Sequence, residues 1–128
     1  MKKIATILLL IFSTNVWPEW ISIKENDTYT YYIDIESISR NGGKGKIWDL
    51  TDYKSVQKTN NDKYLSLRSH TEYDCEEKTS IVLDYSSHSK HMGHGEVVHS
   101  QSNLKDEPFS IPPESLAEWV LKIACGKK

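Results

Sequence analysis

Apolar and polar side chains alternate strictly over residues 64–75, which read YLSLRSHTEYDC. One set of alternate positions is Leu65, Leu67, Ser69, Thr71, Tyr73 and Cys75, and the other is Tyr64, Ser66, Arg68, His70, Glu72 and Asp74. A period of two is the pattern of a β-strand with one buried and one solvated face. The pattern therefore predicts a strand that buries the first set and ends, on its buried face, at a cysteine.

Five other stretches of the chain have strand-like patterns, and turn-forming residues separate them. They cover residues 20–24, 28–34, 46–53, 79–87 and 96–100. Their enrichment in Tyr, Thr, Val and Ile suits a pleated, half-buried surface. Residues 36–40 are expected to be a connection, and Asn60-Asn61-Asp62 is expected to be a hairpin loop. Because consecutive strands with short turns pair antiparallel, we expect one antiparallel sheet of about six strands.

The C-terminal stretch contains a helical pattern. Its apolar residues recur at i, i+3, i+4 and i+7 as one stripe, formed by Leu116, Trp119, Val120 and Ile123. Pro112 and Pro113 suit the first turn of this helix, Glu114 suits the helix dipole there, and Gly126 is a plausible end. The sequence thus predicts an α+β fold, in which the C-terminal helix packs on one face of the sheet.

The beginning of the chain has the organisation of a secretion signal. Lys2 and Lys3 precede the apolar run 4–12, which is far shorter than the roughly 20 residues that span a bilayer. We expect residues 1–18 to be a signal peptide, cleaved between Ser13 and Glu19, and residues 19–128 to form one domain. No cysteine directly follows the apolar run to take a lipid. We therefore expect an exported protein, periplasmic or secreted to the cell surface, without a lipid anchor or a transmembrane helix in the mature chain.

Charge and cysteine content narrow the class of partner and the redox environment. The chain has 16 basic and 18 acidic residues, so that without Lys2 and Lys3 its net charge is −4 with neutral histidines. A mildly acidic domain without an arginine-rich patch is not expected to bind nucleic acid. The two cysteines, Cys75 and Cys125, predict a disulfide in an exported chain, with two free thiols as the weaker alternative. This disulfide would tie the helix to the sheet.

Residues that carry catalytic chemistry are present but form no known local signature. The chain has no nucleophile elbow. Asp49, Asp52 and Asp74 are candidates for paired carboxylates if the fold brings them together, although carboxylates at strand ends are more often solvated. We therefore expect a protein that is not an enzyme and that has no cofactor.

Four histidines fall within residues 88–99, and three of them are spaced by three positions. Imidazole binds zinc and copper well, so His88, His91 and His94 are candidate ligands of a metal-handling protein. A spacing of three places side chains together regularly only on a helix, and Gly93 and Gly95 disfavour a helix here. A solvated histidine-rich turn is the first interpretation, and the metal site is the alternative.

Tyrosines at positions away from the expected core predict a surface that binds protein. We expect Trp48 and Leu50 to face the core, which places Tyr53 on the other face of its strand. Tyr32 likewise lies opposite the positions assigned to the core, and Tyr64 begins the solvated face of its strand. Tyrosine is enriched in protein interfaces because its ring buries area while its hydroxyl stays hydrogen-bonded. The same face, Tyr32, Tyr53 and Tyr64, would also suit a homodimer.

Several short motifs occur together in one order. They are the strand that begins at Trp20, the tyrosine-rich segment 29–34, Ile47–Tyr53, Glu72–Cys75, the Met92-Gly93-x-Gly95 turn, and the segment from Pro112 to Cys125 that ends in Ala-Cys. In this order and spacing they resemble the surface-adhesin protein E family of bacterial exported proteins. The resemblance covers nearly the whole mature chain. It implies an antiparallel sheet with a disulfide-linked C-terminal helix, and a non-enzymatic binding module for host extracellular-matrix or other envelope proteins.

Overall fold

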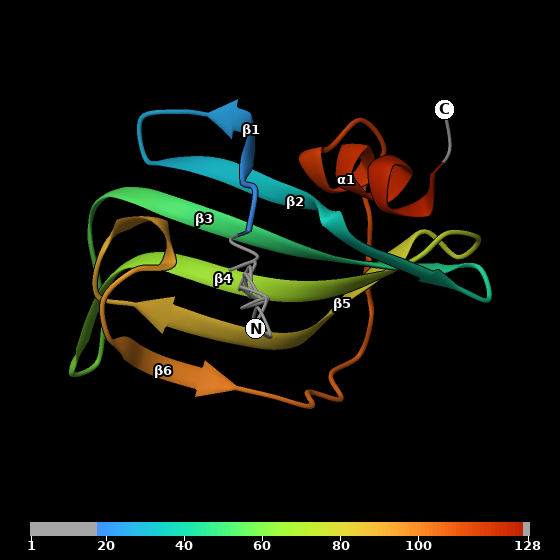
Figure 1. Cartoon of the computed structure of the whole chain (residues 1–128). Coiled ribbons are helices and arrows are strands. Elements are labelled where there is room, and N and C mark those ends of the chain that lie inside the picture. The colour runs from blue at the N-terminus through green and yellow to red at the C-terminus, as the bar shows by residue number, and fades with distance from the viewer. Residues whose placement is uncertain (1–17, 127–128) are drawn as a thin grey trace, which may run out of the picture.

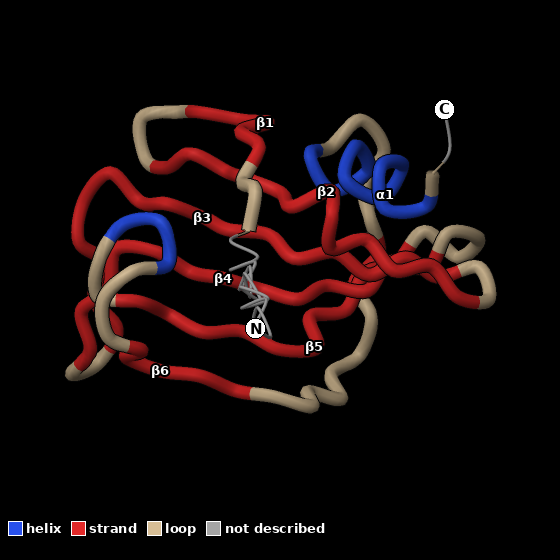
Figure 2. The backbone as a smooth tube through the Cα atoms, viewed as in Figure 1, coloured by secondary structure: helices blue, strands red, loops and turns tan. Residues whose placement is uncertain are grey.

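Six strands lie side by side in the order in which they occur along the chain, and each pairs antiparallel with the next (Figure 1). The computed structural model describes residues 18–126. The strands are β1 (Ile21–Glu25), β2 (Tyr29–Asn41), β3 (Lys44–Thr59), β4 (Asp62–Asp74), β5 (Thr79–His88), β6 (Val97–Gln101) and β7 (Phe109–Ser110). The short strand β7 pairs with β5. The helix α1 (Leu116–Cys125), blue in Figure 2, follows β7 in the chain. The predicted α+β fold, an antiparallel sheet with one C-terminal helix, is confirmed.

Strands β2 and β3 are longer than the sequence predicted. The expected connection 36–40 is part of β2, and β3 continues to Thr59. In each strand the pairing register shifts, between Asp34 and Ser39 in β2 and between Asp52 and Gln57 in β3. A β-bulge interrupts the alternation of side chains. The periodic pattern in the sequence therefore stops at the bulge, although the strand continues beyond it.

The helix begins later than predicted and is rotated so that one residue of the predicted stripe faces outward. Ser115 is its N-cap, and the Ser115 hydroxyl accepts a hydrogen bond from the Glu118 amide. Pro112, Pro113 and Glu114 therefore precede the helix, which corrects the predicted start. Val120 is buried as predicted, and Leu116 and Ile123 of the predicted stripe pack against the core. Leu121 and Ala124 are also buried, whereas Trp119 is 51% exposed. Gly126 ends the helix in the left-handed conformation, as predicted.

Packing of α1 against one face of the sheet forms the core. Its buried members are Ile33, Ile47, Tyr73, Ile111, Val120, Leu121 and Ala124. The helix approaches β3 so closely that a Cβ atom on Gly45 would collide with the backbone carbonyl of Ala124. Arg40 caps the end of the helix, because its Nε donates to the Ala124 carbonyl over 3.0 Å. The predicted disulfide between Cys75 and Cys125 is present at the same end.

The opposite face of the sheet is covered at one end by the connection between β5 and β6, which folds over it (Figure 1). This connection contains a single 3₁₀ turn, η1 (His91–Gly93). Ser66 Oγ donates to the Lys90 carbonyl over 2.7 Å and accepts from the Gly93 amide over 2.9 Å. Ser66 is fully buried, although the alternation in β4 predicted that it would be solvated. The error arises because a loop distant in sequence covers this part of the face.

No helix within residues 18–126 is long and apolar enough to cross a bilayer. The predicted signal peptide lies outside the described residues except for Pro18.

Candidate functional site

Three tyrosines from neighbouring strands form a row on the part of the helix face that α1 leaves uncovered. Tyr29 in β2 pairs with Tyr53 in β3, and Tyr64 in β4 lies beyond Tyr53. The ring centroids of Tyr29 and Tyr53 are 6.4 Å apart, and those of Tyr53 and Tyr64 are 5.8 Å apart. Both contacts are edge to face, at 71° and 77°, an arrangement that stabilises the rings in fixed orientations. Burial raises the pKa of the central Tyr53, so its hydroxyl is protonated at neutral pH.

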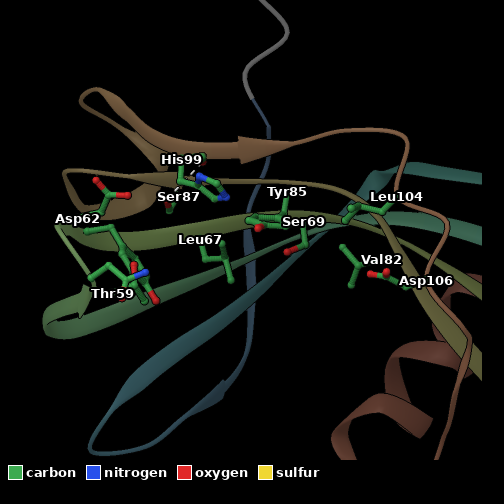
Figure 3. Close-up of a pocket in the computed structure, with 12 residues that line it drawn as sticks. Thr59, Asp62, Leu67, Ser69, Val82, Tyr85, Ser87, His99, Leu104 and Asp106 are labelled. Carbon is green, nitrogen blue, oxygen red and sulfur yellow. Dashed lines mark hydrogen bonds between the residues drawn. The ribbon is translucent and has the colours of Figure 1, made fainter.

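A groove of about 540 Å³ continues from this row across the same face. Figure 3 shows that it runs from the β3–β4 hairpin, at Thr59 and Asp62, to the segment that carries Leu104 and Asp106. Its apolar lining is Tyr64, Leu67, Val82, Tyr85 and Leu104, and its polar lining is Thr59, Asn60, Asp62, Ser69, Ser87, His99 and Asp106. An apolar floor with a polar rim is the usual composition of a protein-binding patch.

Hydrogen bonds and ring contacts hold the walls of the groove. The Leu104 amide donates to the Leu83 carbonyl over 2.9 Å, which fixes the segment beyond β6 against β5. Ser87 Oγ donates to the His99 carbonyl over 3.3 Å, and the Tyr85 and His99 rings lie 5.8 Å apart. The groove is therefore largely preformed, and a ligand would meet ordered side chains.

The structure brings together two of the three tyrosines that the sequence singled out. Tyr53 and Tyr64 are in contact, but on the helix face and not on the solvated face predicted for them. Tyr32 alone lies on the opposite face, where it pairs with Leu50. The predicted three-residue surface is therefore not continuous. The reason is that β3 is apolar on both faces: Ile47 packs under the helix, whereas Leu50 is buried on the other side. Sequence reasoning also missed Leu67 and Tyr85 as groove residues; both lie on the predicted buried faces of their strands, but the helix is too short to cover them.

The three candidate metal ligands do not converge. His88 Nε2 lies 2.8 Å from Ser86 Oγ, and His91 Nδ1 lies 3.0 Å from an Asp52 carboxylate oxygen. The chain reverses between His91 and His94, with Met92 at φ 59°, so a spacing of three does not place the rings together. Among residues 18–126, no three His, Cys, Asp or Glu side chains are arranged to hold a metal ion. The geometry gives no support to the metal-handling alternative.

The three candidate catalytic aspartates are also separate. Asp49 is buried on the helix face, whereas Asp52 lies on the opposite face and accepts a hydrogen bond from the Met92 amide. Asp74 caps the turn after β4, where its Oδ1 accepts from the Glu76 and Glu77 amides. The idea of paired carboxylates is therefore wrong for this set.

Asp49 is instead the centre of a buried polar cluster on the helix face of the sheet. The Tyr31 hydroxyl donates to Asp49 Oδ2 over 2.8 Å, and Thr71 Oγ1 donates to the same oxygen over 3.5 Å. Burial raises the pKa of the Asp49 carboxyl to about 7, although these two hydrogen bonds oppose the shift. The folded protein thus binds a proton at Asp49 far more tightly than the unfolded chain does.

This cluster predicts a loss of stability as the pH rises. The pKa of Asp49 increases from 3.8 to about 7 on folding, so its contribution is complete below pH 3.8 and is lost as the pH approaches 7. Between about pH 5 and about pH 6.5, the wild type should lose roughly 2 kcal/mol of unfolding free energy relative to Asp49→Asn. Urea titrations of both proteins at the two pH values measure this difference. If the unfolding free energies of the two proteins depend equally on pH, the raised pKa of Asp49 is contradicted.

A model of the family described as surface-adhesin protein E matches residues 20–126. The crystal structure of protein E from non-typeable Haemophilus influenzae is similar, with a TM-score of 0.61 and 17% identity over 88% of this chain and 79% of that chain. A second crystal form of H. influenzae protein E gives a TM-score of 0.63 at 17% identity, over 88% of this chain and 91% of that chain. These structures share the fold. No curated protein sequence matches the chain.

Proposed function

The chain belongs to the surface-adhesin protein E family, and from this premise we propose that it is an exported adhesin that binds a protein partner in the aromatic groove. The observation that carries the proposal is the continuous surface formed by Tyr29, Tyr53 and Tyr64 with the groove beyond them. The predicted signal peptide would supply the export that adhesion requires.

The composition of the surface favours a protein partner. Tyrosine rings bury a large area and lose little rotational freedom on binding, and their hydroxyl groups form hydrogen bonds at an interface. The apolar floor at Leu67, Val82 and Tyr85 would accept one or two apolar side chains of the partner. The rim at Asn60, Asp62 and Asp106 would contact its polar groups. The proposed partners are host extracellular-matrix proteins or other envelope proteins.

We propose binding without catalysis. The groove holds His99 and two carboxylates, Asp62 and Asp106. Figure 3 places Asp62 and Asp106 at opposite ends of the groove, so they do not form a catalytic pair across one substrate bond. The groove offers a partner a preformed shape and an apolar area to bury, and these are the properties that binding needs.

The experiment compares substitutions on the two faces of the sheet. Tyr53→Ser combined with Tyr64→Ser removes two rings from the row, and Tyr32→Ser is the matched control on the opposite face. Binding to a panel of purified matrix and envelope proteins is measured by surface plasmon resonance, with folding checked by circular dichroism. For a partner that binds the wild type, the double variant should weaken affinity by at least about tenfold, and the control should leave it unchanged.

Two results would contradict the proposal. One is a partner whose affinity falls in Tyr32→Ser but not in the double variant, which would move the binding surface to the other face. The other is a wild-type dimer that the double variant converts to a monomer, with no partner in the panel affected. That outcome would make the groove a surface for self-association.

A further inference from the structure

Arg68 is a partly buried cation on the face of the sheet opposite the groove. It lies in β4, half-buried, and its Nε is enclosed without a hydrogen-bond partner. Within residues 18–126, none of the ion pairs includes Arg68. The other arginine of the chain, Arg40, donates hydrogen bonds from its guanidinium to the carbonyls at the end of α1. Arg68 has no such structural hydrogen bonds.

An aromatic stack holds the Arg68 guanidinium in place. Its Cζ lies 4.3 Å from the centroid of the Trp48 ring. Trp48 in turn stacks on His70, with ring centroids 4.5 Å apart and planes within 7°. A guanidinium that lies on an indole face is oriented without the use of its N–H donors. The donors at its outer edge are therefore left for another group.

The acidic side chains near Arg68 are engaged elsewhere. Asp34, whose negative charge acts on Arg68, accepts a hydrogen bond from the Glu36 amide over 3.1 Å. Asp84 accepts from the Asn103 amide over 3.1 Å and lies 3.6 Å from His70 Nδ1. Neither carboxylate reaches the guanidinium within the 4.0 Å of an ion pair. A partly desolvated cation that lacks a partner gains more from an incoming anion than a fully hydrated one does.

The surroundings favour an anion with a single charge. His88 lies on the same face, since Ser66 pairs with His88 while Arg68 pairs with Ser86. The Nδ1 of His88 is a second buried nitrogen without a hydrogen-bond partner. Burial lowers the pKa of both His70 and His88, so both rings are neutral at neutral pH. A second cation that acts on His70, Lys46, is paired with Glu72 over 3.9 Å. With Arg68 as the unpaired cation of this group and Asp34 close by, a dianion such as sulfate is a poorer fit.

We propose that Arg68 is an anion-binding residue that takes the carboxylate of a ligand on the free edge of its guanidinium. The planar fork of the guanidinium matches a carboxylate, which it binds through two parallel hydrogen bonds. The carboxylate belongs either to a small free acid or to the C-terminus of a peptide. The site is separate from the aromatic groove, because the two lie on opposite faces of the sheet. It therefore does not depend on the function proposed for the groove.

The experiment follows the Arg68 Nε–H and Trp48 indole resonances by ¹⁵N NMR on the purified, disulfide-bonded protein. The probes are sodium acetate, a tripeptide with a free C-terminus, the same tripeptide amidated, and sodium sulfate, all at matched ionic strength. We expect saturable shifts of both resonances with acetate, with the free tripeptide, or with both, and none with the amidated tripeptide. A tripeptide that binds more tightly than acetate identifies a peptide terminus, and equal affinities identify the carboxylate alone. Saturable binding of sulfate as tight as that of acetate would overturn the preference for a single charge.

Three variants test whether the Arg68 guanidinium binds the carboxylate. In Arg68→Gln the carboxylate affinity, followed at the Trp48 indole, should fall by at least about tenfold. Arg68→Lys keeps the charge but not the fork, and should lie between Arg68→Gln and the wild type. Lys63→Gln removes an exposed positive charge from the same strand and should bind as the wild type does. Equal affinities in Arg68→Gln and the wild type, or the same loss in Lys63→Gln, would overturn the proposal.

Discussion

Val120→Asp is expected to unfold the protein, whereas the same substitution one position earlier, Trp119→Asp, is expected to leave it folded. Val120 is 1% exposed and packs in the core between α1 and the sheet. An ionised carboxylate there would have no partner and no water. The cost should exceed about 5 kcal/mol, which is comparable to the whole stability of a small domain.

Trp119 provides the matched control because it lies next to Val120 but is 51% exposed. A carboxylate at this position stays hydrated, so the loss should remain below about 2 kcal/mol, mainly from the lost packing of the ring. Urea unfolding followed by far-UV circular dichroism separates the two variants. The apolar stripe read from the sequence includes both residues and would make both substitutions severe. Similar losses in the two variants would therefore favour that helix orientation over the one in the structure.

The strand β4 shows why much of the fold could be predicted from the sequence. It pairs with β3 in continuous register from Ser66 to Asp74, so its side chains alternate without interruption. Ser69, Thr71, Tyr73 and Cys75 are buried as the alternation predicted. Where the register shifts, in β2 and β3, the periodic pattern is lost and the predicted strands end too early. Local periodicity thus predicts those parts of a strand in which the pairing is regular.

The candidate site depended on information that periodicity does not contain. The sequence identified Tyr53 and Tyr64, but the assignment of Trp48 and Leu50 to the core placed Tyr53 on the wrong face, together with Tyr32. Leu50 is fully buried because the loop that contains η1 covers the other face. No local pattern shows which of two apolar faces a helix will cover and which a loop will cover. The sequence pattern also did not show that α1 would leave part of the sheet uncovered. The helix has 10 residues, and the groove stays open beyond it.

Arg68 and Trp48 illustrate a different limit. In the sequence they lie 20 positions apart, and although Trp48 falls within the Ile47–Tyr53 motif, no motif contains both residues. Arg68 was assigned correctly to the face of β4 that is opposite the helix, but solvated arginines are common and their partners are not visible in one sequence. Only the cross-strand register brings the guanidinium over the indole and shows that no carboxylate reaches it.

Removal of the disulfide is expected to lower stability without changing the folded structure. Cys75 and Cys125 are 50 positions apart. Loop closure of this length in the unfolded chain predicts a loss of about 4 kcal/mol when the bond is absent. The variant Cys75→Ala with Cys125→Ala should show this loss in urea unfolding, and reductant should lower the wild type to the same level. Reductant should have no effect on the double variant, which serves as the control.

The folded state should survive because other contacts hold the same end of the helix. Arg40 still donates to the Ala124 carbonyl, and the backbone of α1 still packs on Gly45. If the disulfide acts only by restricting the unfolded chain, the NMR spectrum of α1 in the double variant should match that of the wild type except near the two substituted positions. If the disulfide instead holds the helix on the sheet, amide protons throughout α1 should exchange rapidly in the double variant while those of β3 and β4 stay protected. Selective exchange in α1 would therefore contradict the chain-entropy explanation, and equal unfolding free energies with and without reductant would remove any stabilising role for the bond.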